Sequence, residues 1–480
     1  MTSGDSERIL ARFGLDVGFY TLTEFVPAAL GLVGLVVFTR LFDPVAYGRY
    51  SLVVVGVTVG STALFGWLEQ AVLRFESESD AVVPTAVTTL LSLSLGVVAV
   101  GTLARPSVGA LGPFYVAGVV AVVGAGSFRV CRATFQARLE SRRVTLFAAL
   151  RAVVKLGLGL GLSVLVFDSI AGWLWGGAVG SLLAVLAMLG RLDGPRVAFD
   201  RPTFRRLARY GVPMVGWLFG LTLLTFVDRI FIDLLADTAA VGVYASNYAL
   251  VQTGLPLVLS PLIQAAHPAI VSEWSGDNHG EMRTLLAEYS RYFLLLGVGA
   301  TVFAAVISRP LSTLVLGSAF HAGYLVIPVV AGALFLWNFA MLGHKGLELY
   351  ESTGLMTAGI ALAVLVNVAF NYALIPPYGY LGAAVATLLS SAAYAAFAYA
   401  TSMRTVRWTV SHRSLARVAV AGGCMAVVGW AGYLVDSRPL LGPILAGIVG
   451  FGVYAGVLSA LGEVTHRDLS NALGVVGNRE

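Results

Sequence analysis

The chain has 480 residues, of which 58% are hydrophobic and only 12% are charged, and its mean hydropathy is +0.84. Soluble domains carry about 25% charged residues, so this composition excludes a soluble protein and indicates an integral membrane protein. The net charge of +5 does not indicate nucleic acid, because basic residues collect on the cytoplasmic face of membrane proteins. Cys131 and Cys424 are far apart and say little about the redox compartment.

Apolar runs long enough to cross a hydrocarbon core of about 30 Å predict an all-α polytopic protein with about 14 membrane helices. The runs cover residues 16–39, 47–69, 84–104, 113–131, 144–166, 170–190, 210–234, 241–267, 290–308, 323–343, 355–375, 380–401, 416–435 and 440–461. The first run is too long for a signal-peptide core, so we expect it to be retained as a membrane span.

The junction between the first two spans occurs twice in the chain. Six residues recur 194 positions later: Asp43, Ala46, Gly48, Tyr50, Gln70 and Ala71 become Asp237, Ala240, Gly242, Tyr244, Gln264 and Ala265. A second block, Gly176 to Leu183, is repeated as Gly382 to Leu389, 206 positions later. Two matched blocks in the same order predict a duplicated unit of about 200 residues.

The basic residues predict an orientation for these repeats. With a cytoplasmic N-terminus, 23 Lys and Arg fall in cytoplasmic segments, including Arg129 and Arg132, and 6 fall outside; Arg151 and Lys155 lie within the fifth span. This excess favours cytoplasmic N- and C-termini in a cell membrane, and the two six-helix repeats are then parallel. The predicted organisation is a tail (1–13), an N-lobe (14–190), a basic linker (191–209), a C-lobe (210–401), a second linker (402–415), two helices (416–462) and a tail (463–480).

Catalytic and nucleotide-binding motifs are missing from the sequence, which has no Walker loop, no Gly-x-Ser-x-Gly and no zinc motif. We therefore predict a protein that is not an enzyme and uses neither cofactor nor metal. Gly157-Leu-Gly-Leu-Gly161 lies in a membrane helix without a preceding strand, so it indicates close helix packing. Without an ATPase motif, any transport is coupled to a gradient or powered elsewhere.

Charged residues inside apolar runs are the candidate functional residues, since a charge at the bilayer centre costs about 2.5–3.5 kcal/mol. Glu24 lies in the first span, three residues before the helix-bending Pro27. It is either a structural buried carboxyl group or a cavity residue that couples to protons or cations. Arg151 and Lys155 share one face of the fifth span. They either extend toward the cytoplasmic surface or form a cationic lining for phosphate or an acidic sugar.

Two further polar pairs lie in the second half of the chain. Asp228 and Arg229 are near the outer end of the seventh span, where they either pair structurally or help to line and latch a cleft. Asn367 and Asn371 are one turn apart in the eleventh span, and asparagines in this arrangement commonly bind another helix. We interpret this second pair as structural.

Several of these segments resemble one transporter family. The Asp-x-x-Ala-Tyr-Gly-x-Tyr motif of Asp43 to Tyr50, Asp228 followed by Val241 to Tyr244, and Asn367 to Pro376 followed by Gly379 to Thr387 occur in order. Together they resemble the polysaccharide and oligosaccharide-lipid flippases of the multidrug/oligosaccharidyl-lipid/polysaccharide exporter superfamily. The resemblance runs from about Gly14 to Thr401, and the two extra C-terminal helices also fit it.

The resemblance implies a V-shaped pair of six-helix lobes, with helices 1, 2, 7 and 8 lining a central cavity. It implies translocation of polyprenyl-phosphate- or diphosphate-linked oligosaccharide to the outer leaflet by alternating access, with membrane lipids and the polysaccharide or glycosylation machinery as partners. By that analogy Glu24, Arg74 and Asp228 are stronger cavity candidates than Arg151 and Lys155. The loops at Asp43 and Asp237 lie at the outer rim of the implied cavity, so we interpret them as gate candidates.

Two other functions stay open at this point. A cation-coupled drug or small-molecule exporter of the same superfamily needs a compact acidic site, which Glu24 and Asp228 could supply. A membrane glycosyltransferase or polymerase usually carries a large loop or an acidic metal motif, and the sequence shows neither.

Overall fold

The computed structural model describes residues 25–105, 112–192, 197–275, 279–350, 352–406, 408–435 and 441–464, and within these ranges it contains no strand. The prediction of an all-α fold is therefore confirmed. The helical segments are Phe25–Leu41, α2 (Pro44–Phe75), η1 (Glu76–Glu78), α3 (Val82–Ala104), α4 (Pro113–Ala137), α5 (Ser141–Gly161), η3 (Leu162–Val166), α6 (Ala171–Leu189), α7 (Arg201–Leu235), α8 (Thr238–Ser275), α9 (His279–Val306), α10 (Ser308–Val315), η4 (Ser318–Leu325), α11 (Val326–Leu349), α12 (Thr353–Tyr378), α13 (Tyr380–Thr405), α14 (His412–Val435) and α15 (Leu441–Ala460).

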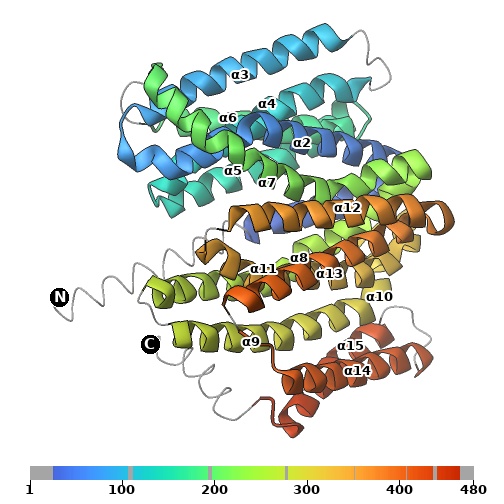
Figure 1. Ribbon diagram of the computed structural model, residues 1–480. Helices are drawn as coiled ribbons and strands as arrows, with labels where there is room; N and C mark the ends of the chain where they lie inside the picture. The colour runs from blue at the N-terminus through green and yellow to red at the C-terminus, as the bar shows by residue number, and fades with distance from the viewer. Residues whose placement is uncertain are drawn as a thin grey trace, which may run out of the picture. The chain divides into compact units, whose positions relative to one another are not determined.

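Each predicted apolar run overlaps one of these helices (Figure 1). Ten helices in the described part of the chain are long and apolar enough to cross a membrane, and Phe25–Leu41 and Ile444–Ala460 are shorter apolar helices. The seventh helix begins earlier than predicted, at Arg201, because hydropathy does not detect its basic first turns. Asp200 caps this helix by accepting a hydrogen bond from the Thr203 amide at 2.9 Å, and hydrogen bonds from Thr203 hold the pKa of the Asp200 carboxyl group below its usual range.

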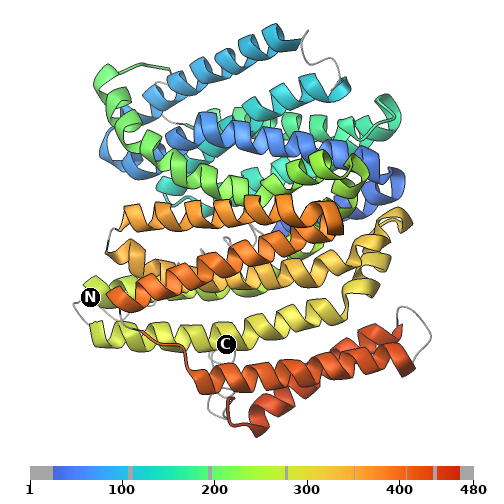
Figure 2. The same cartoon turned by 45° about the vertical axis from the view of Figure 1, so that its right-hand side comes forward.

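The chain divides into two compact units, and the boundary between Ala245 and Ser246 falls within α8. In the first unit α4 packs against α2, α3 and α6, while α5 packs against α6 and α7 packs against α2 (Figure 2). Its core contains Phe65, Leu68, Phe128 and Phe135, each with at most 2% of its surface exposed. The lobe boundaries predicted from the sequence stay a prediction.

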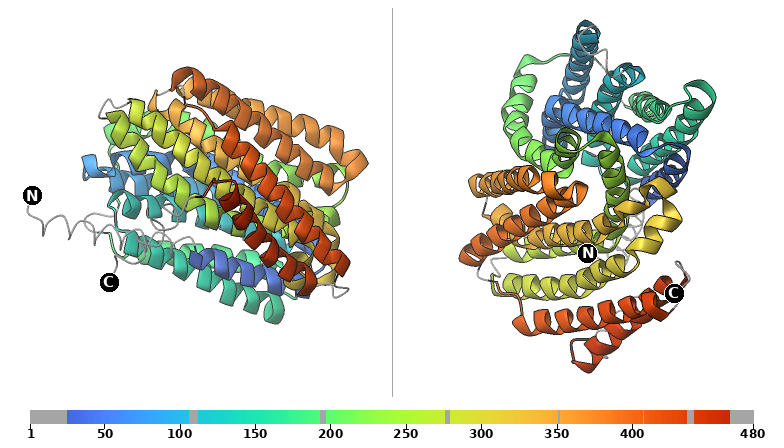
Figure 3. Two further views of the ribbon diagram at one scale, coloured as in Figure 1. Left: turned by 90° about the horizontal axis from the view of Figure 1, so that it is seen from below. Right: turned by 90° about the vertical axis from the view of Figure 1, so that its right-hand side faces the viewer.

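The second unit repeats three of these helix pairs. α9 packs on α11 as α3 packs on α4, α11 packs on α13 as α4 packs on α6, and α12 packs on α13 as α5 packs on α6. The repeated pairs agree with the duplication seen in the sequence. α14 and α15, which have no counterpart in the first repeat, lie side by side and pack on α9 (Figure 3).

An ion-pair cluster connects α14 and α15 to the rest of the second unit. The Glu463 carboxylate follows α15 and accepts hydrogen bonds from Arg291 Nε at 2.8 Å and Arg417 Nη1 at 2.9 Å. Burial of Glu463 raises its pKa, but hydrogen bonds from Ser414, Arg417 and Arg291 outweigh this effect and the pKa is lowered. The carboxylate therefore stays charged at neutral pH and joins α9 to α14.

Candidate functional site

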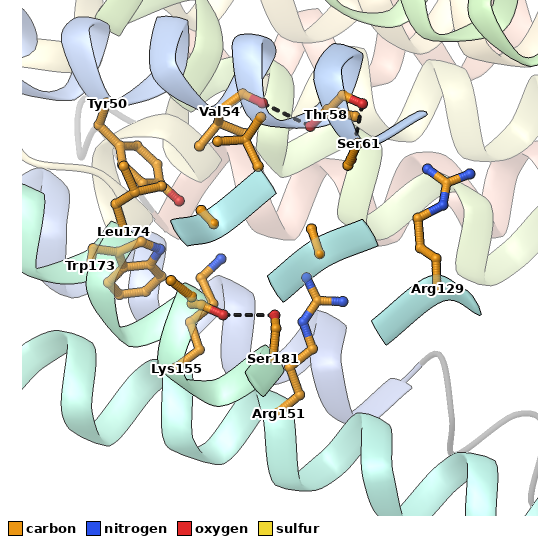
Figure 4. Close-up of a pocket in the computed structure, with 15 residues that line it drawn as sticks. Tyr50, Val54, Thr58, Ser61, Arg129, Arg151, Lys155, Trp173, Leu174 and Ser181 are labelled. Atoms are coloured by element: carbon orange, nitrogen blue, oxygen red, sulfur yellow. Dashed lines mark hydrogen bonds between the residues drawn. The ribbon is translucent and has the colours of Figure 1, made fainter. Parts of the chain in front are cut away.

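A cavity of about 270 Å³ lies in the first unit and is lined by residues of α2, α4, α5 and α6 (Figure 4). Three basic side chains, Arg129, Arg151 and Lys155, line it. The other lining residues are Tyr50, Val54, Val57, Thr58, Ser61, Ala121, Ala125, Trp173, Leu174, Gly177, Ala178 and Ser181. Among the described residues that form this wall there is no Asp or Glu, so its charged side chains are all basic.

Arg129 is the one of these three cations with a close carboxylate partner in the described structure. Its Nε donates to Glu69 Oε2 at 2.8 Å, and its Nη1 donates to the Thr62 hydroxyl at 2.9 Å. Glu69 itself is only 5% exposed. α2 therefore supplies a buried carboxylate that orients the α4 guanidinium at the edge of the cavity.

Arg151 and Lys155 have no ion pair in the part of the chain that the structure describes. The Arg151 guanidinium carbon lies 4.6 Å from the centroid of the Phe128 ring, and Lys155 Nζ lies 5.2 Å from that of Trp173. At a rise of about 1.5 Å per residue they are roughly 15 and 21 Å along α5 from Ser141. Figure 4 shows both side chains directed into the cavity.

A second cavity, also of about 270 Å³, shares Arg151, Lys155 and Trp173 with the first. It is bounded by the Phe25–Leu41 segment, α4 and α5, and its wall includes Pro27 and Arg132. Arg132 Nη2 lies 3.9 Å from Glu69 Oε1, while its buried Nε has no hydrogen-bond partner. Arg151 and Lys155 of α5 therefore face two neighbouring cavities.

Glycines bring α5 close enough to α6 to place these cations. A Cβ on Gly176 would lie 2.4 Å from Gly159 Cα and 2.7 Å from the Lys155 carbonyl oxygen, and one on Gly180 would lie 2.8 Å from the Arg151 carbonyl oxygen. No larger residue fits at these contacts without moving a helix. The glycine run of α5, which the sequence assigned to packing, contributes Gly159 to this interface.

The repeated junctions at Asp43 and Asp237 meet one another within the first unit. Asp43 caps α2 through the Ala46 amide and Asp237 caps α8 through the Ala240 amide, each at 2.7 Å. The contact is reciprocal. A Cβ on Gly48 would lie 2.0 Å from the Thr238 carbonyl oxygen, and a Cβ on Gly242 would lie 2.0 Å from the Pro44 carbonyl oxygen. The backbones of the two copies are therefore in direct contact.

The other candidates lie away from these cavities or outside the described residues. Glu24 lies outside the described residues. The Arg74 side chain is 54% exposed and pairs with Glu78 at 2.6 Å. Asp228 is buried and accepts a hydrogen bond from the Tyr244 hydroxyl at 2.7 Å, while Arg229 Nη1 donates to the Thr225 carbonyl oxygen at 2.8 Å.

The remaining candidates, Asn367 and Asn371, are buried in the second unit, where Asn371 Nδ2 donates to Asn367 Oδ1 at 2.9 Å. Within the described ranges no three His, Cys, Asp or Glu side chains gather in a group that could hold a metal ion. The cavities can bind an anion electrostatically. Sequence reasoning missed Arg129 and Arg132 as cavity residues and Glu69 as the carboxylate beside them, although their position near the ends of apolar runs was visible.

Comparison with known proteins agrees with this architecture. A family model described as "Polysaccharide biosynthesis protein" matches residues 37–324, more than half of the chain. The probable flippase AglR of Haloferax volcanii is 24% identical over 92% of this chain and 96% of its own length. The probable low-salt glycan biosynthesis flippase Agl15 of the same organism is 26% identical, over 44% of this chain and 46% of its own length.

Solved structures support the same fold. The lipid II flippase MurJ, in an inward closed conformation, superposes with a TM-score of 0.77 at 14% identity, covering 92% of this chain and 98% of its own. An inward-facing multidrug resistance transporter of the same superfamily gives a TM-score of 0.61 at 14% identity, over 81% of this chain and 94% of its own. The chain belongs to the polysaccharide biosynthesis protein family, and it has the fold of the flippase and exporter superfamily that its sequence motifs predicted.

Proposed function

We propose that this protein is a flippase that moves a lipid-linked oligosaccharide from the inner to the outer leaflet for surface polysaccharide or glycoconjugate synthesis. The observation that carries the proposal is the match to the probable flippase AglR over 92% of this chain and 96% of that protein. The cationic cavities support it, because the phosphate of a lipid carrier is an anion. A transport role needs no catalytic group and agrees with the multi-pass membrane architecture.

A deletion strain tests this function. We expect lipid-linked oligosaccharide to accumulate on the cytoplasmic face and the surface glycan to disappear, with both restored by the gene on a plasmid. Protease or lectin access to each leaflet in membrane vesicles measures where the glycan lies. A normal surface glycan in a strain without a second flippase gene would contradict the proposal.

The duplicated junctions at Asp43 and Asp237 are the proposed outer gate. Because Gly48 and Gly242 touch the opposite copy at its backbone, opening the outer side requires the start of α2 to separate from the start of α8. Cysteines at positions 43 and 237 should form a cross-link that stops translocation until a reductant is added. Each single cysteine is the control, and a cross-linked protein that still transports would exclude these loops as a gate.

A cation-coupled exporter is the alternative, and the burial of Asp228 in a membrane helix is the observation that favours it. The Tyr244 hydroxyl already bonds that carboxylate, and the described cavities are lined by cations. Both features favour an anionic substrate. Unchanged drug susceptibility in the deletion strain would remove the support for the exporter.

A further inference from the structure

We propose that Arg129, Arg151 and Lys155 form an anion site inside the first helix bundle that takes the phosphate group of the lipid-linked substrate. This inference rests on the proposed function and assigns the substrate's charge to particular residues. The family resemblance implies a central cavity lined by helices 1, 2, 7 and 8. The cations instead come from α4 and α5, and α6 forms the wall behind them.

The charges of the described residues around the cavities favour a ligand of opposite sign. Glu69 is the one described carboxylate close to these cations, and it is held by Arg129, with Arg132 next to it. Among the described residues, Arg151 and Lys155 therefore have no carboxylate partner deep in the bundle. Since an unpaired charge within the membrane is costly, their position is best explained by an anion that enters the site.

The serine and threonine hydroxyls that line the cavity donate to carbonyl oxygens of their own helices and not to a ligand. The Thr58 hydroxyl donates to the Val54 carbonyl at 2.8 Å, Ser61 donates to Thr58 at 3.1 Å, and Ser181 donates to the Gly177 carbonyl at 2.7 Å (Figure 4). Each hydroxyl proton is thus used by its own helix. A phosphate needs donors, so Arg129, Arg151 and Lys155 supply them, whereas the hydroxyl oxygens can accept from a sugar.

The size of the cavities limits what they can hold. Ligand pockets for small molecules span about 300–1,000 Å³, and each cavity here is close to the lower end at about 270 Å³. Such a space fits a phosphate with a neighbouring sugar, and it does not fit a whole oligosaccharide. Arg151 and Lys155 stand between the two cavities, so an anion on them can be reached from either side.

Binding to the purified full-length protein in lipid nanodiscs tests the site. The probes are polyprenyl phosphate, inorganic pyrophosphate and sodium glucuronate, with affinity measured by titration calorimetry. We expect both phosphate probes to bind the wild-type protein, and Arg151→Gln and Lys155→Gln each to weaken binding about tenfold, the equivalent of 1.4 kcal/mol. Lys155→Arg should restore most of the affinity, and binding should weaken as salt is raised.

Arg143→Gln is the matched control, because Arg143 lies on the same helix but is exposed and pairs with Glu140. It should leave the affinity unchanged. Tight binding of polyprenyl phosphate with none of pyrophosphate identifies the lipid headgroup as the source of the phosphate. Binding of glucuronate alone, or equal binding by the wild-type, Arg151→Gln and Lys155→Gln proteins, overturns the proposal. The deletion phenotype does not depend on this titration, so failure of the site and failure of the flippase function are distinguishable.

Discussion

The helices α5 and α12 occupy equivalent places in the two repeats, and their polar residues differ. α5 packs on α6 and presents Arg151 and Lys155 to two cavities. α12 packs on α13, and its Asn367 and Asn371 are fully buried and bonded to each other. The first helix therefore holds two charges that have no ion pair among the described residues, while the second holds a neutral polar pair.

This difference separates what the duplication repeated from what it did not. The repeated feature is helix packing by small residues: Gly176 of α6 fits against α5, and its counterpart Gly382 of α13 fits against the backbone of α12 at Leu374. Among the described residues of these two helix pairs, only α5 supplies ionic side chains that line the two cavities. Packing positions thus define the common fold, whereas Arg151 and Lys155 give the first repeat a chemistry that α12 lacks.

The double variant Arg151→Gln/Lys155→Gln should have the largest effect. We expect translocation of lipid-linked glycan in proteoliposomes to fall about 100-fold, because two charge-assisted contacts to phosphate are lost at about tenfold each. The melting temperature should not fall, since neither residue has an ion pair in the described structure. A variant that unfolds more easily and transports normally when cold would assign these residues to stability instead.

Glu69→Gln tests the role of the carboxylate beside the site. Removing one partner of a buried ion pair costs about 3–5 kcal/mol, and we expect about 3 kcal/mol because the Arg129 side chain is 26% exposed. Unfolding in denaturant, followed by tryptophan fluorescence, measures this loss. Glu78→Gln is the control, because its carboxylate pairs with Arg74 and Arg206 at an exposed position and its loss should cost at most about 1 kcal/mol.

The sequence was sufficient for the fold because membrane helices and their repetition are one-dimensional signals. Apolar runs locate the spans, and the copies at Asp43 and Asp237 reveal the duplication. The site was harder to predict, since hydropathy does not say how a helix is rotated about its axis. Arg129 counted as a cytoplasmic charge, and only the packing of α4 between α2 and α6 turns it toward Lys155. Arg74, favoured by analogy, lies at an exposed helix end.

A matched pair of glycine variants separates packing from charge. Gly176→Ala and Gly382→Ala each place a Cβ within 2.4 Å of the neighbouring helix, and overpacking of this kind costs about 1–3 kcal/mol. We expect similar losses of stability, near the upper end of that range, by thermal unfolding, because each added Cβ meets backbone atoms. Only Gly176→Ala should also reduce anion binding, because it moves the backbone of Lys155. Equal losses of binding would show that the two repeats share the site.

Asn371→Ala should have the smallest effect and completes the contrast between the two helices. It removes the donor that Asn367 Oδ1 accepts from within the same helix, and polar side-chain pairs four residues apart on a helix contribute about 0.2–0.5 kcal/mol to stability. Thermal unfolding should detect this small loss, while phosphate affinity and translocation stay at wild-type levels. Loss of translocation at full stability would mean that α12 acts on the substrate, so the functional division between the repeats would be wrong. An unchanged translocation rate would mean that the polar residues of α12 serve packing only. The charged residues of α5 would then be the feature that distinguishes the first repeat.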